Sequence, residues 1–322
     1  MMPVNTILTG DARAILRTLP SDAVDAVVTS PPYFRLRDYD AAGQIGLERS
    51  VDAWVGELRA VFAEVARVLT PAGSLWLNLG DTYSKGPAMG APRKSLVLAP
   101  ERLLLALAAD GWLVRNKVIW AKSNPLPESV RDRLSTTWEP IYFLTRSPRY
   151  HFELDAIRVP HRGRTRAAVE PNRRYGGGHS GLTRLKAAGR YGHPRGKNPG
   201  DVWRLSKGGY RGAHFATFPP ALIERPILAT VPERVCTGGG RVRRGIVLDP
   251  FFGTGTVGAV ATRLGRDWLG IEVNRAFVPL AMERITAAGG SVRVVDGCTV
   301  GGRVRRPFCL PPQPSTTRRD GP

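Results

Sequence analysis

Residues 249–258, with the sequence DPFFGTGTVG, have the form of a turn that holds a nucleotide-like ligand. Gly253, Gly255 and Gly258 match G-x-G-x-x-G, a spacing that lets the backbone approach a ligand and opens onto a helix N-terminus. Glu272 lies 19 residues after Gly253, at the end of the next expected strand. An acid there can accept hydrogen bonds from both hydroxyls of a ribose. The pattern predicts a site for a cofactor that contains a nucleoside.

The glycine spacing alone leaves the cofactor open between a dinucleotide and S-adenosylmethionine, and a simple helix-capping turn would also show it. Asp249 can pair with an ammonium group, which S-adenosylmethionine carries at this point and NAD does not. Phe251 can lie against an adenine ring. These residues favour S-adenosylmethionine, with an NAD-dependent oxidoreductase as the alternative.

A second motif, Ser30-Pro31-Pro32-Tyr33, follows the apolar run at residues 24–29. Methylation of an aromatic amine requires acceptors for both N–H protons, so that the nitrogen lone pair can turn toward the methyl group. Ser30 and the carbonyl of Pro31 can supply these acceptors, and proline adds no competing N–H. Tyr33 offers a ring on which a base removed from the duplex can stack. The competing interpretation is a proline-stiffened turn after a strand.

Strands and helices alternate around both motifs, which predicts an α/β fold with a doubly wound, mostly parallel sheet that ends in one antiparallel strand. The apolar runs expected to form strands are residues 5–11, 24–29, 74–79, 112–120, 138–144, 246–250 and 268–273. The periodic segments expected to form helices are residues 11–19, 51–69, 98–109, 254–265 and 275–288. Ligands in such sheets bind beyond the carboxyl ends of the strands, where both motifs lie.

The chain is strongly basic, with a formal net charge of +20 over 322 residues, which favours a polyanionic partner. Between Arg158 and Arg211 there are fourteen Lys or Arg residues and only two acids. We expect residues 158–212 to form a basic insert that reads DNA. A solvated Arg-rich loop, or an Arg-rich codon bias, would give the same composition. The basic residues expected to contact DNA are Arg162, Arg164, Arg166, Arg173, Arg174, Arg184, Lys186, Arg190, Arg195 and Lys197.

Several classes of protein are disfavoured by what the sequence lacks. The three cysteines form no CxxC pair and no His cluster has metal spacing, so we expect no metal site. None of the cysteines follows a proline, which argues against a carbon-5 cytosine methyltransferase. No secretory signal or membrane-length apolar run is present, so a cytoplasmic protein without a membrane partner is expected. The tail at residues 299–322 is expected to be disordered.

Taken together, the two motifs resemble those of the DNA amino-methyltransferases that act on adenine N6 or cytosine N4. Their order, with the basic region between them, resembles the β class. The resemblance implies a Rossmann-like, seven-stranded methyltransferase fold with circularly permuted motifs, S-adenosylmethionine as cofactor and double-stranded DNA as substrate. It implies a catalytic half at residues 1–157 and a cofactor half at residues 213–298. The cofactor contacts that it implies are Asp11, Phe218, Asp249, Pro250, Phe251, Gly253, Gly255, Thr256 and Glu272.

The sequence departs from the family pattern at two places, and the first residue of the Ser-Pro-Pro-Tyr motif bears on which base is methylated. Phe34 stands where many relatives have Trp, and we expect it to keep an aromatic wall. Trp138-Glu139 stands where the family usually has His-Glu. Ser at the first position of the motif is commoner in cytosine-N4 enzymes, whereas adenine-N6 enzymes usually have Asp or Asn. We therefore expect cytosine-N4 methylation, and adenine-N6 methylation is the alternative. The expected setting is either restriction-modification, with a cognate restriction endonuclease as a candidate partner, or epigenetic or phage-protective methylation. A DNA-binding protein with a decayed cofactor site would not need both motifs intact.

Overall fold

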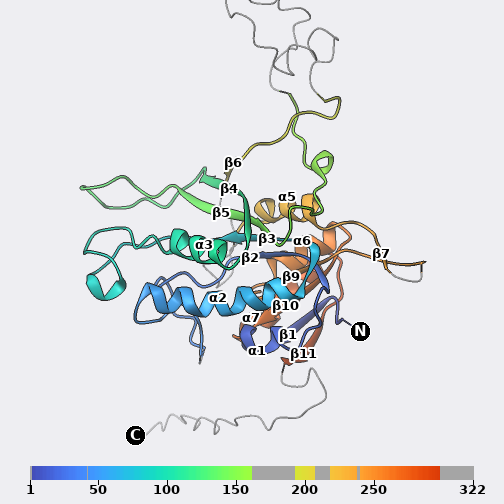
Figure 1. Ribbon diagram of the computed structural model, residues 1–322, viewed down its shortest axis with the longest axis horizontal. Helices are drawn as coiled ribbons and strands as arrows, with labels where there is room; N and C mark the ends of the chain where they lie inside the picture. The colour runs from blue at the N-terminus through green and yellow to red at the C-terminus, as the bar shows by residue number, and fades with distance from the viewer. Residues whose placement is uncertain (1, 42, 162–192, 207–217, 238–239, 298–322) are drawn as a thin grey trace, which may run out of the picture.

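A twisted sheet of nine strands forms the centre of the computed structural model, which describes residues 2–41, 43–161, 193–206, 218–237 and 240–297. The order is β11-β1-β10-β9-β2-β3-β5-β4-β6, from the bottom of Figure 1 to the top. The strands are β1 (Thr6–Thr9), β2 (Val24–Thr29), β3 (Leu69–Asn78), β4 (Leu113–Lys122), β5 (Trp138–Thr145), β6 (Val202–Leu205), β9 (Ile246–Asp249), β10 (Asp267–Glu272) and β11 (Arg293–Asp296). A separate hairpin pairs β7 (Val235–Thr237) with β8 (Arg241–Arg243).

The sheet is mostly parallel, as predicted, and contains all seven expected strands. It is wider than the predicted seven, because β11 and β6 extend its two edges. The antiparallel strand is β5, which lies between β3 and β4 and not at an edge as expected. The reason is the direct return from β4: without an intervening helix the chain comes back beside β4 in the opposite direction.

Helices cover both faces of the sheet in two layers. One layer contains α1 (Ala12–Leu16), α2 (Val51–Val68) and α3 (Ala99–Ala109), and the other contains α5 (Pro220–Thr230), α6 (Thr256–Arg263) and α7 (Phe277–Ala287). Short 3-10 turns lie at Pro87–Met89 and Leu154–Ala156. No helix within the described ranges is long and apolar enough to cross a membrane.

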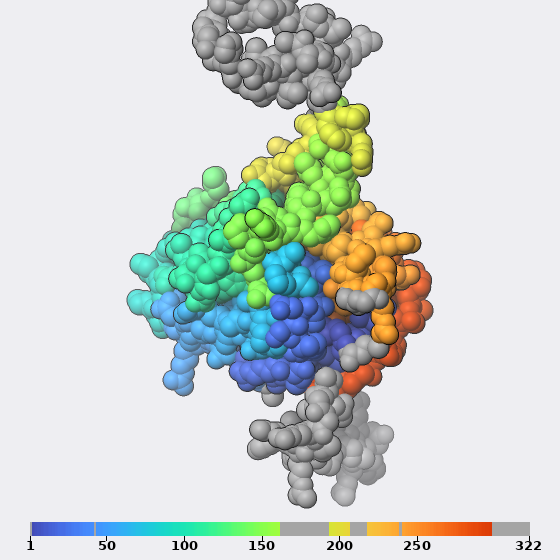
Figure 2. Space-filling view, turned by 45° about the vertical axis from the view of Figure 1, so that its right-hand side comes forward, coloured from blue at the N-terminus to red at the C-terminus, as the bar shows by residue number. Residues whose placement is uncertain are grey.

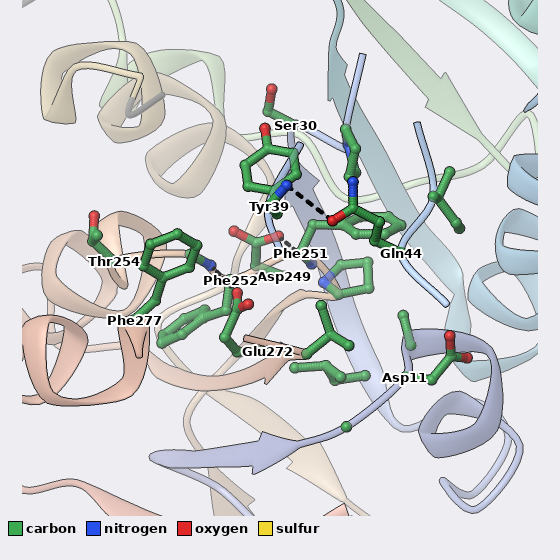
Figure 3. Close-up of a pocket in the computed structure, with 18 of the residues that line it drawn as sticks. Asp11, Ser30, Tyr39, Gln44, Asp249, Phe251, Phe252, Thr254, Glu272 and Phe277 are labelled. Carbon is green, nitrogen blue, oxygen red and sulfur yellow. Dashed lines mark hydrogen bonds between the residues drawn. The ribbon is translucent and has the colours of Figure 1, made fainter. Parts of the chain in front are cut away.

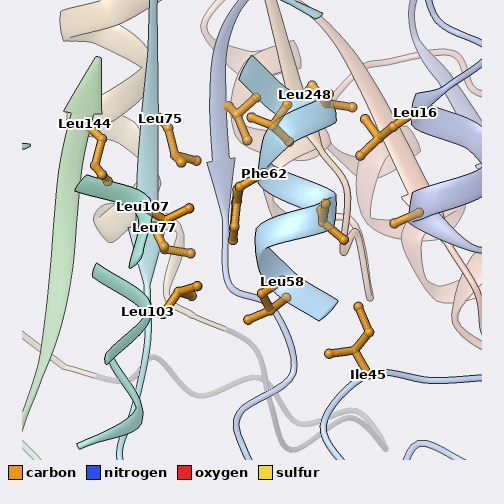
Figure 4. Packing of buried hydrophobic residues seen from close by; sticks show 14 of the residues in the cluster. Leu16, Ile45, Leu58, Phe62, Leu75, Leu77, Leu103, Leu107, Leu144 and Leu248 are labelled. Carbon is orange, nitrogen blue, oxygen red and sulfur yellow. The ribbon is translucent and has the colours of Figure 1, made fainter. Parts of the chain in front are cut away.

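Helix α2 shows how the sequence pattern produces this packing. Ser50 caps its N-terminus by accepting a hydrogen bond from Ala53 N at 3.2 Å. Its apolar residues recur every three or four positions, so that Trp54, Leu58 and Phe62 are fully buried. Figure 4 shows Leu58 and Phe62 directed toward the leucines of β3 and α3. Trp54 also donates from Nε1 to the carbonyl of Pro32 at 3.0 Å, and the helix thereby holds the Ser-Pro-Pro-Tyr turn in place.

The expected aromatic wall at Phe34 is not found. Phe34 is 1% exposed and packs at a tilt against Trp54, with ring centroids 6.3 Å apart. Its side chain belongs to the buried apolar cluster that includes Trp54 of α2, because the turn after Tyr33 leads the chain back into this cluster.

The winding of the chain reverses between β9 and β2, which are adjacent and parallel. From β2 the chain proceeds through α2 toward β3, whereas from β9 it proceeds through α6 toward β10 on the other side. The crevice beyond the carboxyl ends of strands at such a switch point is where open α/β sheets bind ligands. The hydroxyl of Thr29 at the end of β2 donates to Asp249 Oδ1 at the end of β9, at 2.7 Å.

Candidate active site

A pocket of about 880 Å³, part of it open to solvent, lies at this switch point (Figure 3). Its walls come from the carboxyl ends of β1, β2, β9 and β10 and from the loops that follow them. The predicted residues that line it are Asp11, Ser30, Pro32, Phe218, Asp249, Pro250, Phe251, Gly253, Thr256 and Glu272. Pro31, Tyr33 and Gly255 do not line it.

Two buried carboxyl groups set the electrostatics of the pocket. Asp249 is 1% exposed, and its Oδ1 accepts hydrogen bonds from Thr29 and from Phe251 N at 3.0 Å. Burial raises the pKa of Asp249 to about 7, an effect that these two hydrogen bonds oppose and the nearby Glu272 increases. Burial likewise raises the pKa of Glu272 to about 7 against backbone hydrogen bonds from Asn274, Gly253 and Val273. The pocket is therefore poised to take up positive charge.

The three glycines of the turn have different structural roles. Gly253 faces the pocket and donates from N to Glu272 Oε2 at 2.6 Å, which couples the turn to the end of β10. Gly255 has φ of +74°, and a Cβ there would lie 2.8 Å from Cβ of Ala281. A Cβ at Gly258 would lie 2.7 Å from the ring of Phe252. The second and third glycines thus permit the turn and the packing of α6, while the first serves the ligand side.

Asp11 lies at the pocket rim but already has partners of its own. It caps α1 through Arg13 N at 2.8 Å and Ala14 N at 3.1 Å, and its carboxylate pairs with the Arg13 side chain at 2.7 Å. Burial alone would raise the pKa of Asp11, but Arg13 and the two N–H donors outweigh it and lower the pKa. Asp11 is therefore a fixed acceptor at the far end of the pocket, beside Gly10 and Ala12.

The segment that contains Tyr39 and Gln44 closes one wall, and motif reasoning gave neither residue a role. Gln44 Oε1 accepts from Tyr39 N at 2.9 Å, and the Tyr39 carbonyl accepts from Asn274 Nδ2 at 2.9 Å. Gln44 Nε2 is buried and has no hydrogen-bond partner. Since a buried donor without an acceptor is costly, this amide is a position for a ligand acceptor.

These groups match the chemistry of S-adenosylmethionine. Asp249 and Glu272 can receive its positive charge and its ribose hydroxyls, and the Gln44 amide can donate to a nitrogen or oxygen acceptor. Phe251, Phe277 and other aromatic side chains offer faces for the adenine (Figure 3). In the described part of the chain, no group of three or more His, Cys, Asp or Glu side chains is arranged to hold a metal ion.

The Ser-Pro-Pro-Tyr turn places Ser30 between the pocket and a polar network. Ser30 Oγ lies 3.3 Å from the Tyr33 hydroxyl, which donates to Glu139 Oε2 at 2.9 Å. Asn78, at the end of β3, lies 3.2 Å from both the Tyr33 hydroxyl and Glu139 Oε2. The Tyr33 ring lies against Gly80, where a Cβ would be 2.5 Å from ring carbon Cε2. Glu139, the residue whose neighbour departs from the family pattern, is thus linked to the motif.

Most residues expected to contact DNA, from Arg162 to Arg190, lie outside the described residues. Arg195 and Lys197 are described and lie on a projecting arm, coloured lime and yellow in Figure 2. Arg195 pairs with Asp155 at 3.2 Å, and Lys197 pairs through its backbone with Val159. The arm joins the sheet through β6, where Trp203 packs on Trp76 with centroids 6.0 Å apart.

Comparison with known proteins agrees with this site. A family model for N6/N4 DNA methylases matches residues 24–283. The Type II methyltransferase M.XycI of Xanthomonas campestris pv. cyanopsidis is 37% identical over 309 residues, which cover 89% of this chain and 90% of the relative. TTHA0409 of Thermus thermophilus, solved in complex with S-adenosyl-L-methionine, is 26% identical, with a TM-score of 0.58 and coverage of 91% of this chain and 100% of that chain.

The fold is also that of PvuII DNA methyltransferase (cytosine-N4-specific), which is 20% identical with a TM-score of 0.60 and coverage of 90% of this chain and 95% of that chain. The family match spans both motifs and seven of the nine strands of the sheet, all except β1 and β11. The chain belongs to the N6/N4 family of DNA methylases and is a DNA amino-methyltransferase that uses S-adenosylmethionine.

Proposed function

We propose that this enzyme methylates the exocyclic N4 of cytosine in double-stranded DNA. The observation that carries the proposal is Ser30, which stands at the first position of the motif and lines the cofactor pocket beside Asp249. Relatives that act on adenine N6 usually have a carboxylate or an amide at that position. A hydroxyl there is the commoner choice in the cytosine-N4 enzymes that the motif resembles.

The roles of the motif residues follow from what a weak amine nucleophile needs. Ser30 Oγ and the Pro31 carbonyl accept the two N–H protons of the target amine and hold its lone pair toward the cofactor pocket. The Pro32 carbonyl accepts a hydrogen bond from Trp54 Nε1, which fixes the position of the turn. Tyr33 provides a ring for the base outside the helix. When bound, S-adenosylmethionine supplies an activated methyl group, and Asp249 and Glu272 hold the cofactor.

The same proposal divides the chain by task. Residues 1–157 carry the catalytic motif, residues 213–298 carry the cofactor turn, and residues 158–212 read the target sequence with their basic side chains. Of these basic residues, Arg195 and Lys197 lie on the described arm. Because M.XycI is a Type II methyltransferase, we also propose that the enzyme protects DNA beside a cognate restriction endonuclease.

Nucleoside mass spectrometry tests the choice of base. Unmethylated DNA is incubated with the enzyme and S-adenosylmethionine, digested to nucleosides and analysed. N4-methylcytosine is the expected product, and sequencing that detects modified bases should place it in one defined sequence context. N6-methyladenine would overturn the choice of cytosine while leaving the family, the cofactor and the pocket unchanged.

A further inference from the structure

A chain of hydrogen bonds leads from Ser30 away from the pocket to a buried ion pair. The Tyr33 hydroxyl bridges Ser30 Oγ, at 3.3 Å, and Glu139 Oε2, at 2.9 Å. The other carboxylate oxygen, Oε1, accepts from Lys122 Nζ at 2.5 Å. The Lys122 and Glu139 side chains are 9% and 17% exposed. All of these residues lie at the same end of their strands, since β4 ends at Lys122 and β5 begins beside Glu139.

The number of protons fixes the direction of this chain. A tyrosine hydroxyl has one proton, and the carboxylate of Glu139 is a stronger and closer acceptor than the amide oxygen of Asn78 at 3.2 Å. Burial and the nearby Glu139 raise the pKa of Tyr33 well above its usual value, so the phenol keeps its proton. With that proton given to Glu139, the Tyr33 oxygen can only accept from Ser30. Ser30 then has no proton left for the pocket and presents lone pairs alone.

This direction matters for the reaction, because a serine hydroxyl can either donate or accept. A hydroxyl that donated to the amine nitrogen would occupy the lone pair that must attack the methyl group. We propose that Glu139 is a positioning residue that, through the Tyr33 hydroxyl, holds Ser30 as a hydrogen-bond acceptor for the target amine. The proposal rests on the acceptor role assigned to Ser30 under the proposed function, and it is independent of which base is methylated.

The relay also accounts for a serine at a position where relatives often have a carboxylate. The negative charge of Glu139 is linked to the Ser30 hydroxyl through a single intervening residue, Tyr33, and polarises the hydroxyl through it. Asn78 reinforces the arrangement by donating from Nδ2 to Glu139 Oε2 at 3.2 Å and to the Pro140 carbonyl at 3.1 Å. If Glu139 served only as the ion-pair partner of Lys122, its role would not depend on the hydrogen bond with the Tyr33 hydroxyl.

A double-mutant cycle separates the two roles. Tyr33→Phe removes the hydroxyl and keeps the ring, and Glu139→Gln removes the charge and keeps an acceptor. Each is expected to lower kcat by roughly ten- to a hundredfold, and the double variant to fall no further than the less active single variant, because both changes break one chain. KM for DNA and the dissociation constant for S-adenosylmethionine should stay unchanged. The readout is single-turnover transfer of a labelled methyl group to unmethylated DNA.

A matched triad on β4, β5 and α3 provides the control. Tyr142 lies 3.4 Å from Glu101 Oε1, which pairs with Lys117 Nζ at 2.9 Å, away from the pocket. Tyr142→Phe and Glu101→Gln should leave kcat unchanged. Lys122→Gln combined with Glu139→Gln removes the buried ion pair as a unit and should restore thermal stability without restoring kcat.

Either of two results would overturn the relay: independent, multiplicative losses in the cycle, or recovery of kcat together with stability in the Lys122 and Glu139 double variant. Failure of the proposed function gives different signs. A product other than N4-methylcytosine changes only the base, and normal turnover by Ser30→Ala removes the acceptor role itself.

Discussion

Asp249 and Glu272 show how burial prepares individual side chains for a charged ligand. Both stand at strand ends, both have a pKa of about 7, and no cation is described beside either carboxylate. S-adenosylmethionine brings positive charge on its sulfur and its amine, so binding favours the ionised carboxyl groups.

Cofactor affinity should therefore rise with pH. Below pH 7 a proton occupies a site that the cation requires, so the dissociation constant should fall roughly tenfold per pH unit for one titrating group and level off above pH 8. Calorimetric titration with S-adenosylmethionine from pH 5.5 to 8.5 measures it. Asp249→Asn should bind weakly with a flatter profile, and a wild-type profile independent of pH would contradict this account.

Glu272 combines a ligand contact with a structural one, and two substitutions distinguish them. Its oxygens already accept Gly253 N at 2.6 Å and Asn274 N at 2.7 Å. Glu272→Ala removes all acceptors, and we expect the dissociation constant for S-adenosylmethionine to rise by a factor of ten or more, about 1.4 kcal/mol. Glu272→Gln keeps one acceptor oxygen and should lose less. Equal affinity of Glu272→Ala and the wild type would place the ribose contact elsewhere.

Motif spacing found Asp249, Glu272 and Ser30 because each follows a strand that the sequence shows clearly. It could not find the role of Gln44 or Glu139. The bond between Tyr33 and Glu139 joins residues 106 positions apart, and it exists only because β5 returns antiparallel beside β3. A contact of this kind depends on register across the sheet, which composition and periodicity do not encode.

Among strands and helices, those with a clear apolar pattern were predictable, whereas exposed strands at the sheet edges and a helix interrupted by proline were not. The strands β6 and β11 have four residues each and lie at the sheet edges, so that they show little apolar alternation. Helix α5 contains Pro226, which normally argues against a helix because proline lacks an N–H and crowds the preceding turn. Packing against β2 and β3 overrides that local cost.

The close contact between the segment after β3 and the Ser-Pro-Pro-Tyr turn gives a prediction for Gly80. A Cβ there would lie 2.5 Å from the Tyr33 ring, so Gly80→Ala should displace the ring and its hydroxyl. Turnover should fall by about tenfold or more, as expected from roughly 1–3 kcal/mol of lost base stacking, while cofactor affinity stays the same. The control is Gly56→Ala in α2, where no atom lies within 4 Å of the added Cβ. Wild-type turnover by Gly80→Ala would show that the ring can shift harmlessly.

At the scale of the whole molecule, the two buried carboxyl groups of the cofactor pocket lower the free energy of unfolding when they are ionised. Folding removes Asp249 and Glu272 from water, and no cationic side chain in the described part of the chain forms an ion pair with either. The raised pKa values of both groups reflect this burial. Between about pH 4 and pH 7 the folded state holds protons that the unfolded state has released. The free energy of unfolding without cofactor must therefore fall as pH rises through this window, and the cofactor should offset the loss.

Asp249→Asn tests this balance, because the amide keeps an acceptor for Thr29 and Phe251 but carries no charge. The variant and the wild type should have nearly equal thermal stability near pH 4, where Asp249 is protonated in the folded wild type and the unfolded carboxyl has only begun to lose its proton. By pH 8 the variant should be more stable by about 1–4 kcal/mol, given that each unit of pKa displacement corresponds to about 1.4 kcal/mol. Thermal unfolding followed by circular dichroism, without cofactor and at constant salt, gives the comparison. Saturating S-adenosylmethionine should reverse the order, because only the wild type binds it tightly. A variant that lost stability relative to the wild type between pH 4 and pH 8 would contradict this account. The buried carboxylate would then be compensated within the protein itself, and the pocket would not be prepared for a cation.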